Sequence, residues 1–256
     1  MKIGVVIVAT NSYFPLGLRF INNWMRFYKG EHDIYFHLFS DQSPIEYVAT
    51  HDKIHIIHHE TSHSNWVSAT NSKFLNILSL ENEDIEYIYY FDADTKIYRD
   101  FTEEWFIGDI VGGEHFGNAS WMKDNKNFER NPKSEAYIPL DTDLPQMYYL
   151  GAFFGGKRDD VIRMCNVLRY KQLKDKEIKF EPCWNDESYL NCYFHYYPPT
   201  RVVLFKDFKF AISDKGGIKE TRNPKKDVQA LLDNIKQNKT VWWDISNGEF
   251  KLISEK

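Results

Sequence analysis

Two acidic residues end one of the most apolar segments of this sequence. Asp92 and Asp94 close the segment YIYYFDAD, whose aromatic and β-branched run predicts a buried strand over 86–91. Two carboxylates at such a position are hard oxygen ligands, which suit Mg²⁺ or Mn²⁺. These cations usually complete their coordination with water and substrate phosphates. The pair therefore indicates a metal–diphosphate site, and a solvated turn without a ligand is the alternative.

A second acidic pair lies in CWNDESYLNCYF, residues 183–194. Asp186 and Glu187 fall in the first turn of a predicted helix, where carboxylates favour the helix dipole, so simple capping explains them. The functional alternative places Glu187 beside a sugar ring, as a nucleophile or as an electrostatic stabiliser of an oxocarbenium-like transition state. Trp184 supports this alternative, because an aromatic face packs well on the apolar face of a sugar.

A third segment, YYLGAFFGG at 148–156, interleaves small residues with aromatic ones. Small side chains allow a ligand to approach the backbone closely. A tightly packed core strand followed by a Gly–Gly turn has the same pattern. Both interpretations hold if each describes one face of the strand.

The first half of the chain alternates strands with helices, which predicts a mostly parallel sheet flanked by helices, a Rossmann-like α/β fold. Ligands of such sheets bind at the carboxyl ends of the strands, which is where Asp92 and Asp94 lie. The apolar periodicity predicts strands over 2–10, 33–40, 53–58 and 86–91 and helices over 15–29 and 69–80.

The second half is less regular. Residues 111–150 show no clear periodicity, which is typical of a functional loop region. Further helices are predicted over 159–173, with Asp159 or Asp160 as its cap, over 185–197 and over 225–237. A strand is predicted over 201–212, and a strand or hairpin over 241–253, with Asn247–Gly248 as its turn.

Composition excludes several protein classes. The net charge of -5 and pI near 6.0 disfavour a nucleic-acid binder. No apolar stretch approaches the ~20 residues of a membrane helix, and the N-terminus reads as a strand rather than a signal peptide. The three cysteines (Cys165, Cys183 and Cys192) form no C-x-x-C pair, so we expect free thiols in a reducing cytosol and a soluble, cytoplasmic protein. The P-loop, dinucleotide and G-x-S-x-G motifs are absent from the sequence.

The segments AYIP, YYLGAFFGG and WNDESYLNCYF, in this order and spacing, resemble glycosyltransferase family 6. The resemblance implies a GT-A fold with its D-x-D motif at a strand end. It implies retaining transfer of galactose or N-acetylgalactosamine from a UDP-sugar to O3 of a galactoside, in an α1,3 linkage. It also implies Mn²⁺, with Mg²⁺ as the alternative, held by Asp92 and Asp94 against the UDP diphosphate.

The resemblance also assigns roles residue by residue, with Glu187 as the catalytic residue. The implied donor and nucleotide contacts are Val8, Thr10, Tyr13, Lys73, Asp92, Ala93, Asp94, Leu150, Gly151, Ala152 and Asp186. The implied acceptor contacts are His115, Trp184 and Glu187. Leu150 and Ala152 combine features of galactose-specific and N-acetylgalactosamine-specific members, so the donor stays open.

The chain departs from the family pattern at three positions. Asn185 replaces a histidine, Ser68 replaces an aspartate, and Lys73 replaces an arginine. Lysine keeps the positive charge but loses the bidentate fork, which puts donor affinity in question rather than the reaction class. Both aspartates of the D-x-D motif are present, which favours a metal-dependent reaction. Lys251 and Lys256 are candidates for a basic tail that closes over UDP.

We expect one GT-A catalytic domain over residues 1–256, with a nucleotide-binding half (1–98), a donor- and acceptor-binding half (99–212) and a C-terminal extension (213–256). Two other enzymatic functions stay open, namely transfer of another sugar or linkage and hydrolysis of a UDP-sugar. A carbohydrate-binding module, with 142–156 and Trp184 as its sugar-binding face, is the alternative of another class. Such a module has no need of a diphosphate site, so binding of UDP separates it from the enzymes.

Overall fold

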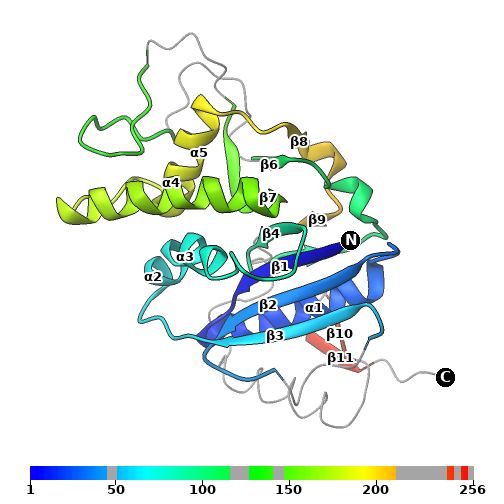
Figure 1. Ribbon diagram of the computed structural model, residues 1–256. Coiled ribbons are helices and arrows are strands. Elements are labelled where there is room, and N and C mark those ends of the chain that lie inside the picture. The colour runs from blue at the N-terminus through cyan, green and yellow to red at the C-terminus, as the bar shows by residue number, and fades with distance from the viewer. Residues whose placement is uncertain (45–50, 116–126, 141–146, 212–240, 245–248, 253–256) are drawn as a thin grey trace.

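The computed structural model describes residues 1–44, 51–115, 127–140, 147–211, 241–244 and 249–252. A seven-stranded sheet forms its centre, in the order β3-β2-β1-β4-β7-β6-β8, with helices packed against it (Figure 1). The strands of the sheet are β1 (Lys2–Val8), β2 (Asp33–Ser40), β3 (Ile54–Glu60), β4 (Tyr87–Phe91), β6 (Ile110–Glu114), β7 (Tyr149–Lys157) and β8 (Arg201–Val203). The α-helices are α1 (Phe14–Phe27), α2 (Trp66–Asn71), α3 (Lys73–Leu78), α4 (Arg158–Glu177) and α5 (Asn185–Tyr196).

The sheet is mostly parallel, with β7 as the exception. Strands β1, β2, β3 and β4 pair in parallel, whereas β7 runs antiparallel to both β4 and β6. Because β7 runs in the opposite direction, its first residues reach the same edge as the carboxyl ends of β1 and β4. The chain leaves β1 toward β2 on one side and returns to β4 on the other, so a crevice opens between the ends of β1 and β4.

Two apolar cores cover the two faces of the sheet. Alternate residues of β1 divide between them, with Ile3, Val5 and Ile7 facing α1, and Val6 and Val8 facing α3, α4 and α5. Burial on both faces explains why the predicted strands are apolar at nearly every position. The predicted strands over 2–10, 33–40, 53–58 and 86–91 and the helix over 15–29 are therefore confirmed, with ends shifted by one or two residues.

The helix predicted over 69–80 is in fact two short helices that meet at Ser72. The Ser72 hydroxyl and N–H both donate to the carbonyl of Ala69, at 2.7 and 3.2 Å, which tightens the chain and interrupts the regular ladder. The preceding helix α2 starts at a capping box in which Asn65 accepts from the Ser68 N–H. Ser68 therefore has a local structural role at this position.

Two further expectations need correction in the second half of the chain. Helix α4 has Lys157 at its N-cap, so Asp159 and Asp160 lie in the first turn, where they favour the helix dipole without capping. The region 111–150 was expected to be irregular, yet it contains most of β6 and the start of β7. The predicted helix over 185–197 is confirmed as α5.

The strand predicted over 201–212 was wrong. Strand β8 ends at Val203, a 3₁₀ turn covers Phe205–Asp207, and β9 (Phe210–Ala211) pairs with β5 (Lys96–Ile97). The indole N–H of Trp105 donates to the carbonyl of Asp207 at 3.0 Å and fixes this turn. Two other 3₁₀ turns cover Asn11–Tyr13 and Glu103–Trp105.

At the C-terminal end, β10 (Val241–Asp244) and β11 (Glu249–Leu252) pair antiparallel, as the predicted hairpin requires. Its turn at Asn247–Gly248, the predicted helix over 225–237 and Lys256 lie outside the described residues. All three cysteines are free thiols, as expected. No helix among the residues that the structure describes is long and apolar enough to cross a membrane.

Candidate active site

A cleft of about 680 Å³ opens at the edge where β1 and β4 end and β7 begins. All the residues that the sequence analysis singled out as donor, acceptor, metal or catalytic residues line this one cleft. They are Val8, Thr10, Tyr13, Lys73, Asp92, Ala93, Asp94, His115, Leu150, Gly151, Ala152, Trp184, Asp186 and Glu187. The structure thus brings together residues that are up to 179 positions apart in the chain, while their individual roles stay predictions.

The two aspartates follow β4 directly and both face the cleft. The Tyr90 hydroxyl donates to Asp92 Oδ1 at 2.8 Å, and the Asp92 side chain is one-third exposed. Asp94 is 9% exposed, and Arg19 donates to its carbonyl oxygen at 3.2 Å. Tyr13 lines the same cleft, where burial first and then the charges of Asp94 and Asp92 raise its pKa.

Lys73 is the buried cation at the centre of the site, only 2% exposed. Its ammonium lies 2.6 Å from Asp186 Oδ2 and 3.5 Å from Asp92 Oδ1, and it donates to the carbonyl of Gly151 at 3.1 Å. Burial lowers the pKa of Lys73, but the combined attraction of Asp186 and Asp92 outweighs burial and raises it. The side chain therefore stays charged and joins α3, α5, β4 and β7.

The charge balance of the cleft matters for any phosphate ligand. Among the described residues that line it, four are carboxylates and Lys73 is the only Lys or Arg. The Lys73 ammonium is already paired with Asp186. The four carboxylates of the described lining would repel an anionic diphosphate, and a bound cation would reduce this repulsion.

The oxygen ligands that this cleft offers suit a divalent cation that also coordinates a substrate. Asp92 and Asp94 supply hard carboxylate oxygens on one wall. No group of three or more His, Cys, Asp or Glu residues that could hold a metal occurs in the described part of the chain. A cation held by these two aspartates would thus take its remaining ligands from water and phosphate oxygens, as Mg²⁺ and Mn²⁺ commonly do.

Glu187 is held by two hydrogen-bond donors from the start of β7. The Gly151 N–H donates to Oε2 at 2.6 Å, and the Tyr148 hydroxyl donates to Oε1 at 2.8 Å. Burial raises the pKa of Glu187 to about 7, although both hydrogen bonds act in the opposite direction. The carboxyl group is therefore fixed in orientation and titrates near neutral pH, which is typical of a catalytic acid or base.

The small residue at position 151 allows the carboxylate to approach the strand. A Cβ atom on Gly151 would lie 2.9 Å from the Cβ and 3.0 Å from Oε2 of Glu187, closer than packed atoms tolerate. The flanking side chains, Leu150 and Ala152, are 3% and 5% exposed and line the same wall of the cleft. The group that approaches the backbone here is Glu187 of the protein itself, and close approach by a ligand stays a prediction.

Trp184 and His115 lie at other walls of the cleft. Trp184 is the N-cap of α5 and is 50% exposed, so its ring is accessible to a ligand. The next residue, Asn185, has a φ of 45°, a left-handed conformation that asparagine adopts more readily than most residues. The half-buried His115 packs edge-on against Tyr148 at 5.5 Å, and burial lowers its pKa.

Sequence reasoning missed several residues that build the site. Tyr148 and Tyr90 bond the carboxylates of Glu187 and Asp92, and Asn191 bonds the backbone of both Tyr149 and Glu187. The sequence pattern predicts these tyrosines as core residues, and their burial agrees with this. The pattern does not indicate that their hydroxyls hold carboxylates. Trp66, 54% exposed at the start of α2, also lines the cleft.

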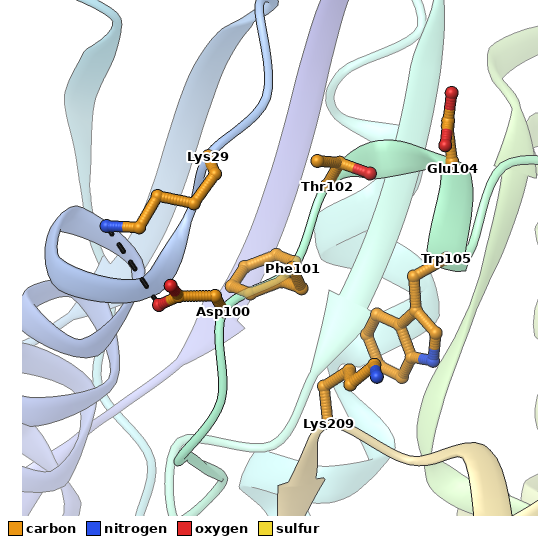
Figure 2. A pocket seen from close by; sticks show the side chains of 7 residues that line it. All are labelled: Lys29, Asp100, Phe101, Thr102, Glu104, Trp105 and Lys209. Carbon is orange, nitrogen blue, oxygen red and sulfur yellow. Dashed lines mark ion pairs between the residues drawn. The ribbon is translucent and has the colours of Figure 1, made fainter.

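A second hollow of about 480 Å³ lies between the end of α1 and the β5–β9 ladder (Figure 2). Phe101 and Trp105 form part of its lining, and Lys29 and Asp100 face each other across 4.0 Å at its rim. It includes none of the predicted site residues. The cleft at the sheet edge therefore remains the candidate active site.

The fold and the cleft together are those of a GT-A-type glycosyltransferase, and comparison with known proteins gives the family. The model of glycosyltransferase family 6 matches residues 1–211. This chain belongs to glycosyltransferase family 6.

Individual relatives match parts of the chain. It is similar to histo-blood group ABO system transferase 2 of Rattus norvegicus, with 33% identity over 120 residues that cover 47% of this chain and 35% of the relative. It is 26% identical to globoside alpha-1,3-N-acetylgalactosaminyltransferase 1 of Gallus gallus over 211 residues, which cover 79% of this chain and 60% of the relative. It is 30% identical to the O-antigen biosynthesis glycosyltransferase WbnI of Escherichia coli over 117 residues, which cover 44% of this chain and 48% of the relative. The matched part therefore spans 35% to 60% of these relatives.

Proposed function

We propose that this protein is a retaining glycosyltransferase that moves galactose or N-acetylgalactosamine from a UDP-sugar to O3 of a galactoside-containing oligosaccharide. The cleft carries this proposal, because it joins the Asp92 and Asp94 pair to a buried glutamate that titrates near neutrality. Membership of family 6 supports the reaction class. The name of the Gallus gallus relative supports both the α1,3 linkage and N-acetylgalactosamine as one candidate sugar.

We propose that Asp92 and Asp94 hold Mn²⁺ or Mg²⁺ together with the diphosphate of the donor. When bound, the cation would supply the positive charge that the cleft lacks and would stabilise the departing UDP. Asp92 is the more exposed of the two aspartates, at one-third of its side chain. Val8, Thr10 and Tyr13 line the neighbouring part of the cleft, where we place uracil and ribose.

The proposed reaction breaks the bond between C1 of the sugar and the phosphate oxygen, and the electron pair leaves with UDP. The acceptor O3 then bonds to C1 on the face that UDP left, and its proton passes to the departing phosphate or to solvent. Glu187 acts as an anion in one of two ways. It bonds to C1 as UDP leaves, and this bond breaks when O3 attacks C1, or it stabilises the positive charge that develops at C1. The Tyr148 hydroxyl and the Gly151 N–H keep this carboxylate fixed while the charge develops.

The remaining residues position the two sugars. Lys73 and Asp186 form an ion pair beside Gly151, which places a fixed polar wall next to the donor sugar. Leu150 and Ala152 line the same wall and would decide between galactose and its N-acetylated form. Trp184 and His115 are the proposed contacts of the acceptor, with the exposed indole as the stacking surface.

A panel of UDP-sugars with lactose, N-acetyllactosamine and their 2′-fucosylated forms tests this function directly. NMR of the product should show an α1,3-linked galactose or N-acetylgalactosamine. A product with a β linkage would overturn the retaining assignment. Release of free sugar with every acceptor would instead identify a UDP-sugar hydrolase, and binding of glycans without any binding of UDP would identify a carbohydrate-binding module.

Calorimetry with UDP tests the metal assignment separately. UDP should bind much more tightly with Mn²⁺ than with EDTA, and Asp92→Asn should remove the difference. Equal affinity under the two conditions would show that the aspartates hold no metal. Glu187→Gln is the matched control, because it should abolish transfer while leaving the affinity for UDP nearly unchanged.

A further inference from the structure

We propose that Asn191 is a positioning residue, whose buried amide clamps α5 to the first residue of β7 and so sets the place of the Glu187 carboxylate. The proposal rests on the function proposed above, in which Glu187 is the catalytic residue. Asn191 is 1% exposed and is not among the residues that line the cleft. It therefore acts on the reaction through another residue.

The amide of Asn191 makes three hydrogen bonds. Its Oδ1 accepts from the Tyr149 N–H at 2.7 Å, and its Nδ2 donates to the Tyr149 carbonyl at 2.8 Å. The same Nδ2 also donates to the backbone carbonyl of Glu187 at 2.9 Å. One side chain thus satisfies both backbone groups of Tyr149 and connects them to the backbone of the proposed catalytic residue.

The position of Tyr149 in the sheet explains why a side chain is needed here. Pairing between β4 and β7 ends at Phe91 opposite Phe153, because the chain leaves the sheet at Asp92. One backbone bond follows, from the Asp92 N–H to the Ala152 carbonyl at 3.0 Å. After it, side chains bond the backbone groups of Gly151 and Tyr149 that do not pair with β6, with Glu187 and Lys73 on Gly151 and Asn191 on Tyr149. An amide offers a donor and an acceptor in one plane, as a neighbouring strand would.

The geometry of the carboxylate depends on this clamp. Asn191 follows Glu187 by four residues on α5, so both lie on the face of the helix that meets β7. The separation between α5 and β7 therefore decides whether the Gly151 N–H, now at 2.6 Å, and the Tyr148 hydroxyl reach the carboxylate. Asparagine is the only residue type of this size that both accepts from one peptide N–H and donates to two carbonyls.

Asn191→Asp tests the proposal, because it keeps the shape and the acceptor for Tyr149 but removes both donations. We expect the affinity for UDP to persist while kcat falls on the order of 10²-fold, the cost of misplacing a reacting group by ~1 Å. The new charge in Asn191→Asp raises the midpoint of the Glu187 titration by itself, so Asn191→Ser is the informative variant for this readout. Its midpoint should rise because the ionised carboxylate loses the Gly151 N–H and the Tyr148 hydroxyl. Carbon-13 NMR of labelled glutamate carboxyls follows this titration, with Glu187→Gln identifying the signal.

Two further variants make the result decisive. Asn191→Ser also gives the kcat readout should the new carboxylate of Asn191→Asp prevent folding. Gln172→Leu is the matched control, since it removes a buried amide on α4 whose hydrogen bonds go to Asn71 and Arg169 and not to Glu187 or β7. It should lower stability while leaving both kcat and the Glu187 titration unchanged.

A Glu187 titration that is the same in wild type and Asn191→Ser would overturn the proposal, whatever happens to activity. The titration needs no substrate, so it remains informative even if the chain proves to catalyse another reaction. Conversely, confirmed α1,3 transfer together with an unchanged titration would refute the positioning role alone.

Discussion

Glu187 connects the local environment of one residue to the pH dependence of the whole reaction. Burial raises its pKa to about 7, and the proposed reaction needs the ionised form. We therefore expect transfer to be slow at pH 6 and to increase through pH 7 to a plateau near pH 8. A profile of kcat against pH measures this directly, and a rate that stays constant from pH 6 to 8 would contradict the role of Glu187.

The same shift predicts an effect on stability. The folded state holds the Glu187 proton more tightly than the unfolded chain does. Glu187 therefore adds to the free energy of unfolding below pH 4.5, and this contribution is lost as pH rises through about 7. Once the carboxylate is ionised, the rise in pKa corresponds to a loss of about 3 kcal/mol in the free energy of unfolding. Glu187→Gln should therefore unfold at higher urea than wild type at pH 8, and the gain should vanish near pH 4.5. Equal stability at pH 8 would contradict this.

Gly151→Ala should inactivate the enzyme without unfolding it. The added Cβ would overlap the Glu187 side chain, which must then move away from the Gly151 N–H and the Tyr148 hydroxyl. We expect kcat to fall on the order of 10²-fold, as for other ~1 Å misplacements of a reacting group. Calorimetry should show an unchanged affinity for UDP with Mn²⁺. Ala152→Gly, which removes bulk from the neighbouring position, is the control that should keep Glu187 in place.

At this scale the sequence identifies the groups that could react but not the groups that hold them. Asp92 is recognisable because a charge at the end of an apolar strand requires an explanation, whereas Asp186 and Glu187 gain their roles from the resemblance to family 6. Tyr148 and Asn191 act through a hydroxyl at the end of a core ring and through an amide on a helix. Their partners are backbone atoms or residues 39 and 42 positions away, and such pairing depends on the strand register.

Two elements, β2 and β3, are joined by a histidine pair that should make the protein sensitive to acid. His37 Nδ1 and His59 Nε2 are 3.0 Å apart, and the buried His37 has its pKa lowered to about 4, first by burial and then by His59. A neutral pair shares one proton between these nitrogens, whereas a second proton would place two donors against each other.

The sign of this effect follows from the lowered pKa. The unfolded chain binds the His37 proton more readily than the folded protein, so stability is present above pH 6.5 and is lost toward pH 4. His37→Asn keeps a polar group near Nδ1 and should make urea unfolding less dependent on pH across this range. The exposed His51 provides the control, and His51→Asn should retain the full acid sensitivity. The same slope in wild type and His37→Asn would contradict the assignment.

Elements were predictable where burial alone decides them. Strands β1, β2 and β4 are apolar because both of their faces are covered, and this pattern has no other simple explanation. The break between α2 and α3 and the turn after β8 depend on single hydrogen bonds, from the Ser72 hydroxyl to Ala69 and from the Trp105 indole to Asp207. Such contacts do not alter apolar periodicity, so the sequence could not show them.

For the whole molecule, Lys73 links the two proposed halves of the chain through a buried charge. Its ammonium joins Asp92 to Asp186 and to the Gly151 carbonyl. Lys73→Met would leave Asp186 buried without its cation, which typically costs about 3–5 kcal/mol. Urea unfolding of the protein without ligands should show this loss. Lys73→Met combined with Asp186→Asn should recover much of it, and a double variant as unstable as the single one would contradict the pairing.

The reversed direction of β7 has a consequence for how the protein acquires its activity during synthesis. The side of the cleft that carries Asp92 and Asp94 is encoded before residue 100, but another wall comes from a strand that pairs with β4 some sixty residues later. That strand must already be paired before α5 can dock Glu187 against it. Long-range pairing of this kind forms slowly and late. A nascent chain would therefore form the proposed nucleotide pocket before it forms the wall that holds Glu187, and the proposed sugar transfer would begin only after β7 has paired.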